Sequence, residues 1–237
     1  MSQLTAIDRL HPALIATIIF VIASANLIAH YAHGRAIFLV IPTTALLLGA
    51  AALVSGLRWR DLGVTPAQLR AGLPWAAVVA AAVVVIILVA VAIPPLREFF
   101  LDERFRSPRT ALLAAFVVIP LQTVLPEELL FRGVLQGALM RTWSVPVALG
   151  VGAVLFGLWH ITSSMNLAGD NKGLRDVVGS GDAGQILGVL LAVVATTAAG
   201  LVFGWLRYKT DSLLPSIALH WALNATGALG AALAWRL

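Results

Sequence analysis

The sequence predicts an all-α, polytopic transmembrane helical bundle of about seven spans, within a range of six to eight. The 237 residues are 60% hydrophobic and only 11% charged, a composition far from that of soluble domains. Mean hydropathy is correspondingly high, at +0.94. The apolar residues form long runs between short polar gaps, and no soluble domain or internal repeat is evident. Residues 1–237 are therefore expected to form a single integral membrane domain.

Each predicted span is an apolar run of roughly 20 residues, the length a helix needs to cross the hydrocarbon core. The runs are Pro12–Ala29, Ala36–Leu57, Leu73–Ile93, Thr110–Met140, Val145–Ile161, Gln185–Leu206 and Leu213–Trp235. The fourth run is too long for a simple span and contains Pro126. It predicts either one tilted, kinked helix or a spanning helix followed by a second that starts at Pro126. Two small-xxx-small patterns, at 133–137 and 200–204, predict close helix packing.

The first run also has features of a signal peptide, because Arg9 precedes it and Ala23–Ala25 supplies the small residues of a cleavage site. Its apolar stretch is long, however, and six further runs follow. We therefore expect it to be retained as a span. His11, His30 and His33 flank this run and are expected to be solvated.

The polar gaps suggest how the chain lies in the membrane. Residues 58–70 form a basic gap that is predicted to be interfacial, and residues 166–184 are predicted to be a Gly/Asp-rich loop. Short-loop arginines with few acidic neighbours favour the side that holds the N-terminus as the cytoplasmic one. The composition, rich in arginine, alanine and glycine, suggests a bacterial protein and hence the bacterial inner membrane.

Net charge and cysteine content narrow the classes of function. A net charge of +5 would suggest nucleic acid in a soluble protein, but the arginines lie in the gaps, where membrane orientation explains them. No nucleic-acid partner is therefore expected, and the expected partners are the lipid bilayer and a protein or peptide substrate. The sequence has no cysteine, which excludes disulfides, thiolate chemistry and cysteine-ligated zinc.

Six polar residues lie inside predicted spans: Glu127, Glu128, Arg132, His160, His220 and Asn224. A charge at the bilayer centre costs about 2.5–3.5 kcal/mol on insertion scales. The three charges within 127–132 would together oppose insertion by about 8–10 kcal/mol if they had no partners. We expect the six side chains to converge on one cavity, because scattered polar groups would each face lipid alone.

Helical geometry gives the two glutamates different surroundings. At about 100° per residue, Glu128 and Arg132 share a helix face with the glutamate on the N-terminal side, which suits an ion pair. Glu127 lies about 140° around from Arg132 and has no counter-ion on its own helix. Such a carboxylate suits proton transfer. The alternative for Glu128 and Arg132 is a buried salt bridge that only locks helices together.

The two intramembrane histidines lie in short polar motifs. His160 ends the sequence FGLWH, one turn after Phe156, and His220 begins HWALN, one turn before Asn224. A lone intramembrane histidine is more often a packing partner. Two of them with a free carboxylate and an amide favour a site instead. The set offers a base, two imidazoles that can bind a metal, stabilise an oxyanion or orient water, and an amide donor, which suffices for hydrolysis of an amide bond.

These motifs resemble those of the CPBP family, the type II CAAX-prenyl endopeptidases and their bacterial relatives, also called Abi proteins. The family is marked by E-E-x-x-x-R, F-x-x-x-H and H-x-x-x-N or H-x-x-x-B on successive membrane helices. Here the motifs read EELLFR (Glu127–Arg132), FGLWH (Phe156–His160) and HWALN (His220–Asn224), in that order. The resemblance covers roughly residues 110–235, and the N-terminal half matches only as apolar spans.

The resemblance implies an intramembrane endopeptidase that hydrolyses a peptide bond of a membrane-associated protein or peptide. It implies water activation by Glu127, water positioning by His160, oxyanion stabilisation by His220 with Asn224, and support by Glu128 and Arg132. The family has been described both as metal-dependent and as a glutamate-type protease, so a divalent metal such as zinc stays open. A proton- or ion-coupled transporter and a non-catalytic immunity or scaffold protein also stay open, because intramembrane Glu, His and Asn line ion pathways too.

Overall fold

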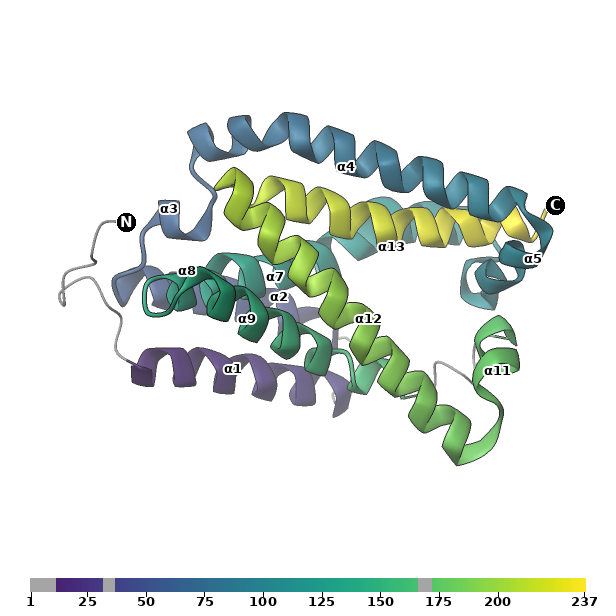
Figure 1. Ribbon diagram of the computed structural model, residues 1–237, viewed down its shortest axis with the longest axis horizontal. Helices are drawn as coiled ribbons and strands as arrows, with labels where there is room; N and C mark the ends of the chain where they lie inside the picture. Colours follow the sequence, from purple (N-terminus) through teal and green to yellow (C-terminus); the bar gives the residue numbers. More distant parts are fainter. Residues whose placement is uncertain (1–11, 32–36, 166–171) are drawn as a thin grey trace.

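The computed structural model describes residues 12–31, 37–165 and 172–237, and these residues form an all-helical bundle, as predicted (Figure 1). The long helices are α1 (Pro12–Tyr31), α2 (Ile37–Val54), α4 (Pro66–Ala92), a continuous helix over 108–140, α9 (Val145–Trp159), α12 (Gly181–Thr210) and α13 (Leu214–Ala234). Short helices connect them: α3 (Trp59–Leu62), α5 (Pro94–Arg97), α11 (Lys172–Val178) and the 3₁₀ turns Glu98–Phe100, Glu103–Phe105 and Thr162–Ser164.

The helices agree with the predicted spans. Among the described residues, five helices are long and apolar enough to cross a membrane, and two shorter apolar helices cover 38–54 and 145–159. Large apolar side chains also point outward along the bundle, including Phe20, Leu46 and Ile86, which are 72%, 69% and 63% exposed. In lipid such exposure carries no hydrophobic penalty. The chain is a multi-pass integral membrane protein.

The third span begins earlier than its apolar run. The prediction started it at Leu73, whereas α4 starts at Pro66. Thr65 and Gln68 form a capping box, in which Thr65 Oγ1 accepts from the Gln68 backbone N–H and Gln68 Oε1 accepts from that of Thr65. The first two turns are polar, so hydropathy alone does not reveal them.

The fourth run is one continuous helix rather than two. It consists of α6 (Pro108–Leu113), α7 (Leu125–Glu128) and α8 (Gln136–Met140), joined by π-helical segments over Ala114–Val124 and Leu129–Leu135. Pro120 lies within the first π-helical segment, where its carbonyl accepts the Leu125 N–H five residues on. Widened turns of this kind re-pair the backbone around proline, so the helix continues through both Pro120 and Pro126.

The prediction of a loop over 166–184 is wrong for its second half. Lys172–Val178 form α11, which ends before Gly179 at a φ of +86°, and α12 already begins at Gly181. His30, in the last turn of α1, is exposed on the surface of the bundle. Arg9, His11, His33 and residues 166–171 lie outside the described residues.

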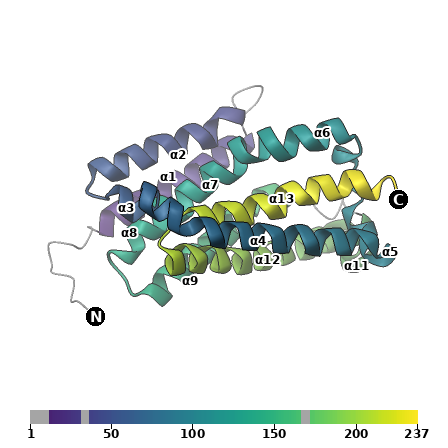
Figure 2. The same ribbon diagram turned by 90° about the horizontal axis from the view of Figure 1, so that it is seen from above.

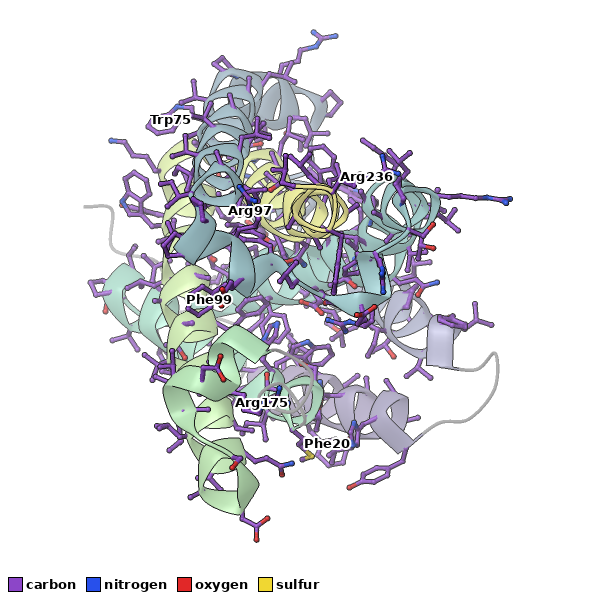
Figure 3. The ribbon with its side chains drawn as sticks, turned by 90° about the vertical axis from the view of Figure 1, so that its right-hand side faces the viewer. Phe20, Trp75, Arg97, Phe99, Arg175 and Arg236 are labelled. Carbon is purple, nitrogen blue, oxygen red and sulfur yellow. The ribbon has the colours of Figure 1, made fainter. Side chains whose placement is uncertain are left out.

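The bundle is organised around α13, which packs on α4 and on the 108–140 helix, while α12 packs on α9 and α1 on α2 (Figure 2). The buried core includes Ile18, Leu130, Val134, Phe156 and Phe203, contributed by α1, the 108–140 helix, α9 and α12. Figure 3 looks onto one end of the bundle, where Arg97, Arg175 and Arg236 lie. Four of the polar motif residues, Glu127, Glu128, Arg132 and His220, are buried among the packed helices.

Candidate active site

Glu128 and Arg132 form a buried ion pair one turn apart on the 108–140 helix. Arg132 Nη1 lies 3.1 Å from Glu128 Oε1, and the two side chains are 3% and 0% exposed. Arg132 Nη2 also donates to the carbonyl of Gly200 on α12, at 3.3 Å. The predicted helical phase therefore holds across the π-helical segment. Arg132 links the 108–140 helix to α12 as well as neutralising its own glutamate.

Glu127 points to a different set of partners. Its Oε1 accepts a 3.2 Å hydrogen bond from the indole Nε1–H of Trp159 at the end of α9. Its Oε2 is buried without a hydrogen-bond partner in the described part of the chain. No lysine or arginine among the described residues forms an ion pair with Glu127, and His220 Nε2 lies 4.0 Å from Oε2. Glu127 thus has one oxygen held and one available.

His220 on α13 lies between the two glutamates. Its Nδ1 is 3.0 Å from Glu128 Oε1, while its Nε2 faces Glu127 Oε2 at 4.0 Å. An ionised carboxylate can only accept, so Nδ1 carries the proton in the hydrogen bond with Glu128. In a neutral imidazole, Nε2 is then an unprotonated acceptor directed toward Glu127. Glu128 therefore fixes both the orientation and the tautomer of His220.

Aromatic rings enclose these polar groups. The Arg132 guanidinium lies 3.9 Å from the Phe156 ring centroid and 4.8 Å from that of Phe203. The His220 ring stacks on Phe203, with centroids 5.1 Å apart and an interplanar angle of 23°. Phe131 contacts both Phe156 and Trp159 edge-on. Such a wall excludes water and strengthens the electrostatic interactions inside it.

Glycines let α9 and α12 approach closely enough to form this wall. A Cβ at Gly157 would collide with the Thr197 hydroxyl and lie 2.8 Å from the Val193 carbonyl. A Cβ at Gly200 would lie 3.2 Å from Ala153 Cα. The predicted packing role of the 200–204 pattern agrees with this contact. The same approach brings the Gly200 carbonyl to Arg132.

His160 and Asn224 lie less directly in this arrangement. His160 follows α9, is half-buried, and its Nδ1 lies 2.8 Å from the Phe156 carbonyl, with its ring against that of Phe156. Asn224 is half-buried one turn beyond His220 on α13. The structure thus brings four of the six predicted residues into direct contact or near contact, namely Glu127, Glu128, Arg132 and His220, and places the other two on the elements that carry their partners.

A catalytic zinc ion takes three protein ligands, and the described side chains around Glu127 supply fewer. Glu127 and His220 Nε2 face one gap, whereas His220 Nδ1 is occupied by Glu128 and His160 Nδ1 faces its own helix. Across the described ranges, no group of three His, Asp or Glu side chains is arranged to hold an ion. The side chains as they lie do not fit a zinc site, so the mechanism proposed below contains no metal step.

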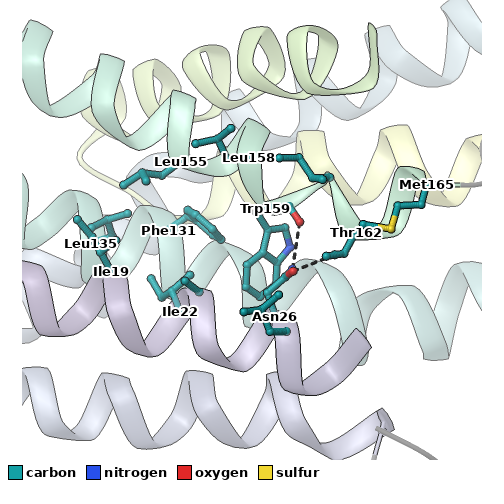
Figure 4. Close-up of a pocket in the computed structure, with 13 residues that line it drawn as sticks. Ile19, Ile22, Asn26, Phe131, Leu135, Leu155, Leu158, Trp159, Thr162 and Met165 are labelled. Carbon is teal, nitrogen blue, oxygen red and sulfur yellow. Dashed lines mark hydrogen bonds between the residues drawn. The ribbon is translucent and has the colours of Figure 1, made fainter. Parts of the chain in front are cut away.

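An apolar cavity of about 400 Å³ adjoins Trp159 (Figure 4). Its walls come from α1, the 108–140 helix and α9, with Ile22, Phe131 and Leu158 among them. At one end, Asn26 donates to the Trp159 carbonyl at 3.0 Å and accepts from the Thr162 hydroxyl at 2.8 Å. One residue, Trp159, therefore forms both a wall of the apolar cavity and the hydrogen bond to Glu127.

A family model described as type II CAAX prenyl endopeptidase Rce1-like matches residues 109–226, about half of the chain. The chain belongs to this family. The Rce1-like region contains all six motif residues together with Trp159, Phe203 and Gly200, whereas α1, α2 and α4 precede it. Family membership implies a membrane-embedded protease, a hydrolase. No curated protein and no solved structure matches the chain.

Sequence reasoning missed Trp159 and Asn26. Trp159 stands next to His160 in the FGLWH motif, but nothing in its spacing indicates that its indole reaches Glu127, because that contact depends on how α9 packs against the 108–140 helix. Asn26, by contrast, could have been singled out from the sequence. It is an amide inside the first apolar run, and such residues are costly in lipid unless they have a partner.

Proposed function

We propose that this protein is an endopeptidase that hydrolyses a peptide bond of a membrane-associated protein or peptide, with Glu127 as the base that activates water. The observation that carries the proposal is that the two glutamates have different partners. Oε2 of each glutamate is buried without a hydrogen-bond partner among the described residues. Glu128 is nevertheless paired with Arg132 and accepts from His220 through Oε1, whereas Glu127 has no arginine or lysine partner in the described ranges and its Oε2 lies 4.0 Å from His220 Nε2. That separation is too long for a direct hydrogen bond and suits one bridging water.

In the proposed reaction, the water donates one O–H to Glu127 Oε2 and the other to His220 Nε2. Glu127 takes a proton as the water oxygen bonds to the carbonyl carbon of the substrate. Glu127 then returns this proton to the leaving nitrogen as the C–N bond breaks. We propose for His220 the water-positioning role that the family resemblance gave to His160, which the 4.0 Å separation of His220 Nε2 from Glu127 Oε2 supports. Asn224 keeps the oxyanion-stabilising role that the resemblance implied, and His160 becomes a second candidate donor to the oxyanion in place of His220.

The apolar cavity supports a substrate that is partly embedded in the membrane. An aliphatic portion of the substrate lying against Ile22, Phe131 and Leu158 would touch the Trp159 ring, whose N–H holds Glu127. The arginine-rich composition supports a bacterial inner membrane as the location. A carboxylate beside an imidazole could also serve a proton relay, so the preference for a hydrolase over a transporter rests on the match to the endopeptidase family model.

The test compares peptides released from membranes by cells that express wild type, Glu127→Gln or Glu103→Gln. Glu103 is the matched control, because it is a surface glutamate, 69% exposed and paired with Arg106, in a 3₁₀ turn outside the bundle core. We expect peptides that disappear with Glu127→Gln and persist with Glu103→Gln. Identical profiles for all three strains, with the proteins present at equal levels, would refute the protease proposal.

A further inference from the structure

A second, polar cavity of about 490 Å³ lies at the end of the bundle where α3, α8 and the last turn of α12 meet. Gly137, one of its lining residues, is ten residues beyond Glu127 on the same helix, or about 15 Å at 1.5 Å per residue. Its charged lining consists of Arg58, Arg60, Asp61, Arg141, Arg207 and Asp211. This cavity therefore lies at one end of the bundle and is separate from the candidate active site.

Arginines outnumber acidic residues in the described lining of this cavity. Asp61 Oδ2 is shared by Arg58 at 3.3 Å and Arg141 at 3.4 Å, and Asp211, itself 69% exposed, pairs with Arg207 at 3.3 Å. Arg60 is exposed and has no acidic partner among the described residues. The charged residues that line the cavity are thus four arginines and two aspartates, and Arg60 forms no ion pair with an acidic residue of the described ranges.

The loop that carries these arginines is held rigidly. Arg207, whose side chain is 6% exposed, donates from Nη2 to the Asp61 carbonyl at 3.0 Å. Gln68 donates to the Arg60 carbonyl at 2.9 Å, and the Arg58 N–H donates to Asp61 Oδ2 at 2.8 Å. Gly63 turns the chain with a φ of +75° directly against the Arg207 guanidinium, where a Cβ would collide. The backbone that carries Arg58 and Arg60 is therefore held in place by hydrogen bonds to neighbouring helices.

We propose that this cavity binds the phosphate of an anionic phospholipid headgroup. Guanidinium forks match the geometry of phosphate oxygens, and basic pockets at the membrane ends of helices suit lipid headgroups. Two aromatic residues place the cavity at headgroup depth, since Trp59 is 62% exposed beside it and Tyr208, 45% exposed, lines it. A free phosphate ion shares this chemistry, but the volume is many times the roughly 30 Å³ of one water and suits a larger group.

The experiment titrates the purified full-length protein in detergent with phosphatidylglycerol, phosphatidylcholine or inorganic phosphate, and counts bound lipids by native mass spectrometry. We expect phosphatidylglycerol to bind in preference to phosphatidylcholine. Arg60→Gln should weaken phosphatidylglycerol binding about fivefold, and Arg58→Gln with Arg60→Gln about 25-fold, since each interfacial arginine contributes about that factor. The control is Arg109→Gln, which should change nothing, because Arg109 is an exposed residue of α6 and α6 lies at the opposite end of the bundle from α3 and α8 (Figure 2).

The inorganic phosphate arm separates the two sources of phosphate. Competition only at much higher concentration than the lipid supports the headgroup, whereas tight phosphate binding with no lipid preference would assign the site to the free ion and overturn the lipid proposal. Equal binding of the two phospholipids by wild type would overturn it without any variant. Equal losses for Arg60→Gln and Arg109→Gln would also overturn it, because general surface charge would then explain the binding.

Discussion

Glu128 and His220 are 92 residues apart in sequence and are joined by a 3.0 Å hydrogen bond inside the bundle. This contact ties α13 to the 108–140 helix and turns the second imidazole nitrogen toward Glu127. The adjacent glutamates therefore act on the same histidine from opposite sides. Glu128 orients the ring, and Glu127 borders the gap in which we propose that the water binds.

The Glu128–Arg132 pair gives a stability prediction. Glu128→Gln leaves Arg132 buried without its counter-ion, which should cost about 3–5 kcal/mol of unfolding free energy in a dry site. The double variant Glu128→Gln with Arg132→Gln removes both charges and should recover part of that loss. Melting temperatures in detergent measure both effects. If Glu128→Gln had the same melting temperature as the wild type, the ion pair would contribute little to stability.

Trp159→Phe tests the hydrogen bond to Glu127. Phenylalanine keeps an aromatic wall against Phe131 but removes the indole N–H that holds Glu127 Oε1. Misplacement of a catalytic group by about 1 Å can cost about 100-fold in rate, so kcat should fall by one to two orders of magnitude. The melting temperature should change little. A loss of activity that merely follows a loss of folded protein would argue for a packing role alone.

Much of this arrangement can be predicted from the sequence. The features that cannot be predicted have physical causes. Runs of apolar residues predict the spans because lipid imposes a fixed length on each helix, and the spacing of Glu128 and Arg132 predicts their pairing because one helix contains both. Apolar runs and residue spacing do not predict the polar first turns of α4 or the π-helical segments around Pro120. They depend on capping and on backbone hydrogen bonds rather than on hydropathy.

Contacts between helices were the least predictable part of the site. The six motif residues were expected to converge, but sequence does not say which histidine would lie next to Glu127. That choice depends on the rotation of α13 against the 108–140 helix and on the close approach of α9 and α12 at Gly157 and Gly200. The contribution of Trp159 arises from the same packing and has no signature in the spacing of the motifs.

Membrane orientation can be tested with single cysteines, because the natural sequence has none. Lys209 and Ser180 are exposed near opposite ends of α12. The arginine distribution predicts that Lys209 faces the cytoplasm. An impermeant thiol reagent applied to intact cells should therefore label Ser180→Cys and spare Lys209→Cys. The reverse pattern would invert the topology, and labelling after lysis serves as the control for reactivity.

Removal of metal ions provides a separate test of the mechanism. Glu127 and His220 supply two donors to the gap between them, one fewer than a catalytic zinc normally takes. We expect proteolysis to survive dialysis against a chelator, with activity within about twofold of the untreated enzyme. If zinc alone restored an activity lost to chelation, a third ligand such as His160 would have to move into the gap.

The measurement that tests the central claim most directly is the pairing of activity with melting temperature for Glu127→Gln. Glutamine keeps the shape of the side chain and can still accept from Trp159, but it cannot take a proton from water. The account predicts that proteolysis is abolished while the melting temperature equals or slightly exceeds that of wild type, because a buried charge without a cation is removed. Retained cleavage by folded Glu127→Gln, or an unstable Glu127→Gln beside a stable, inactive Glu128→Gln, would contradict it and reverse the roles of the two glutamates.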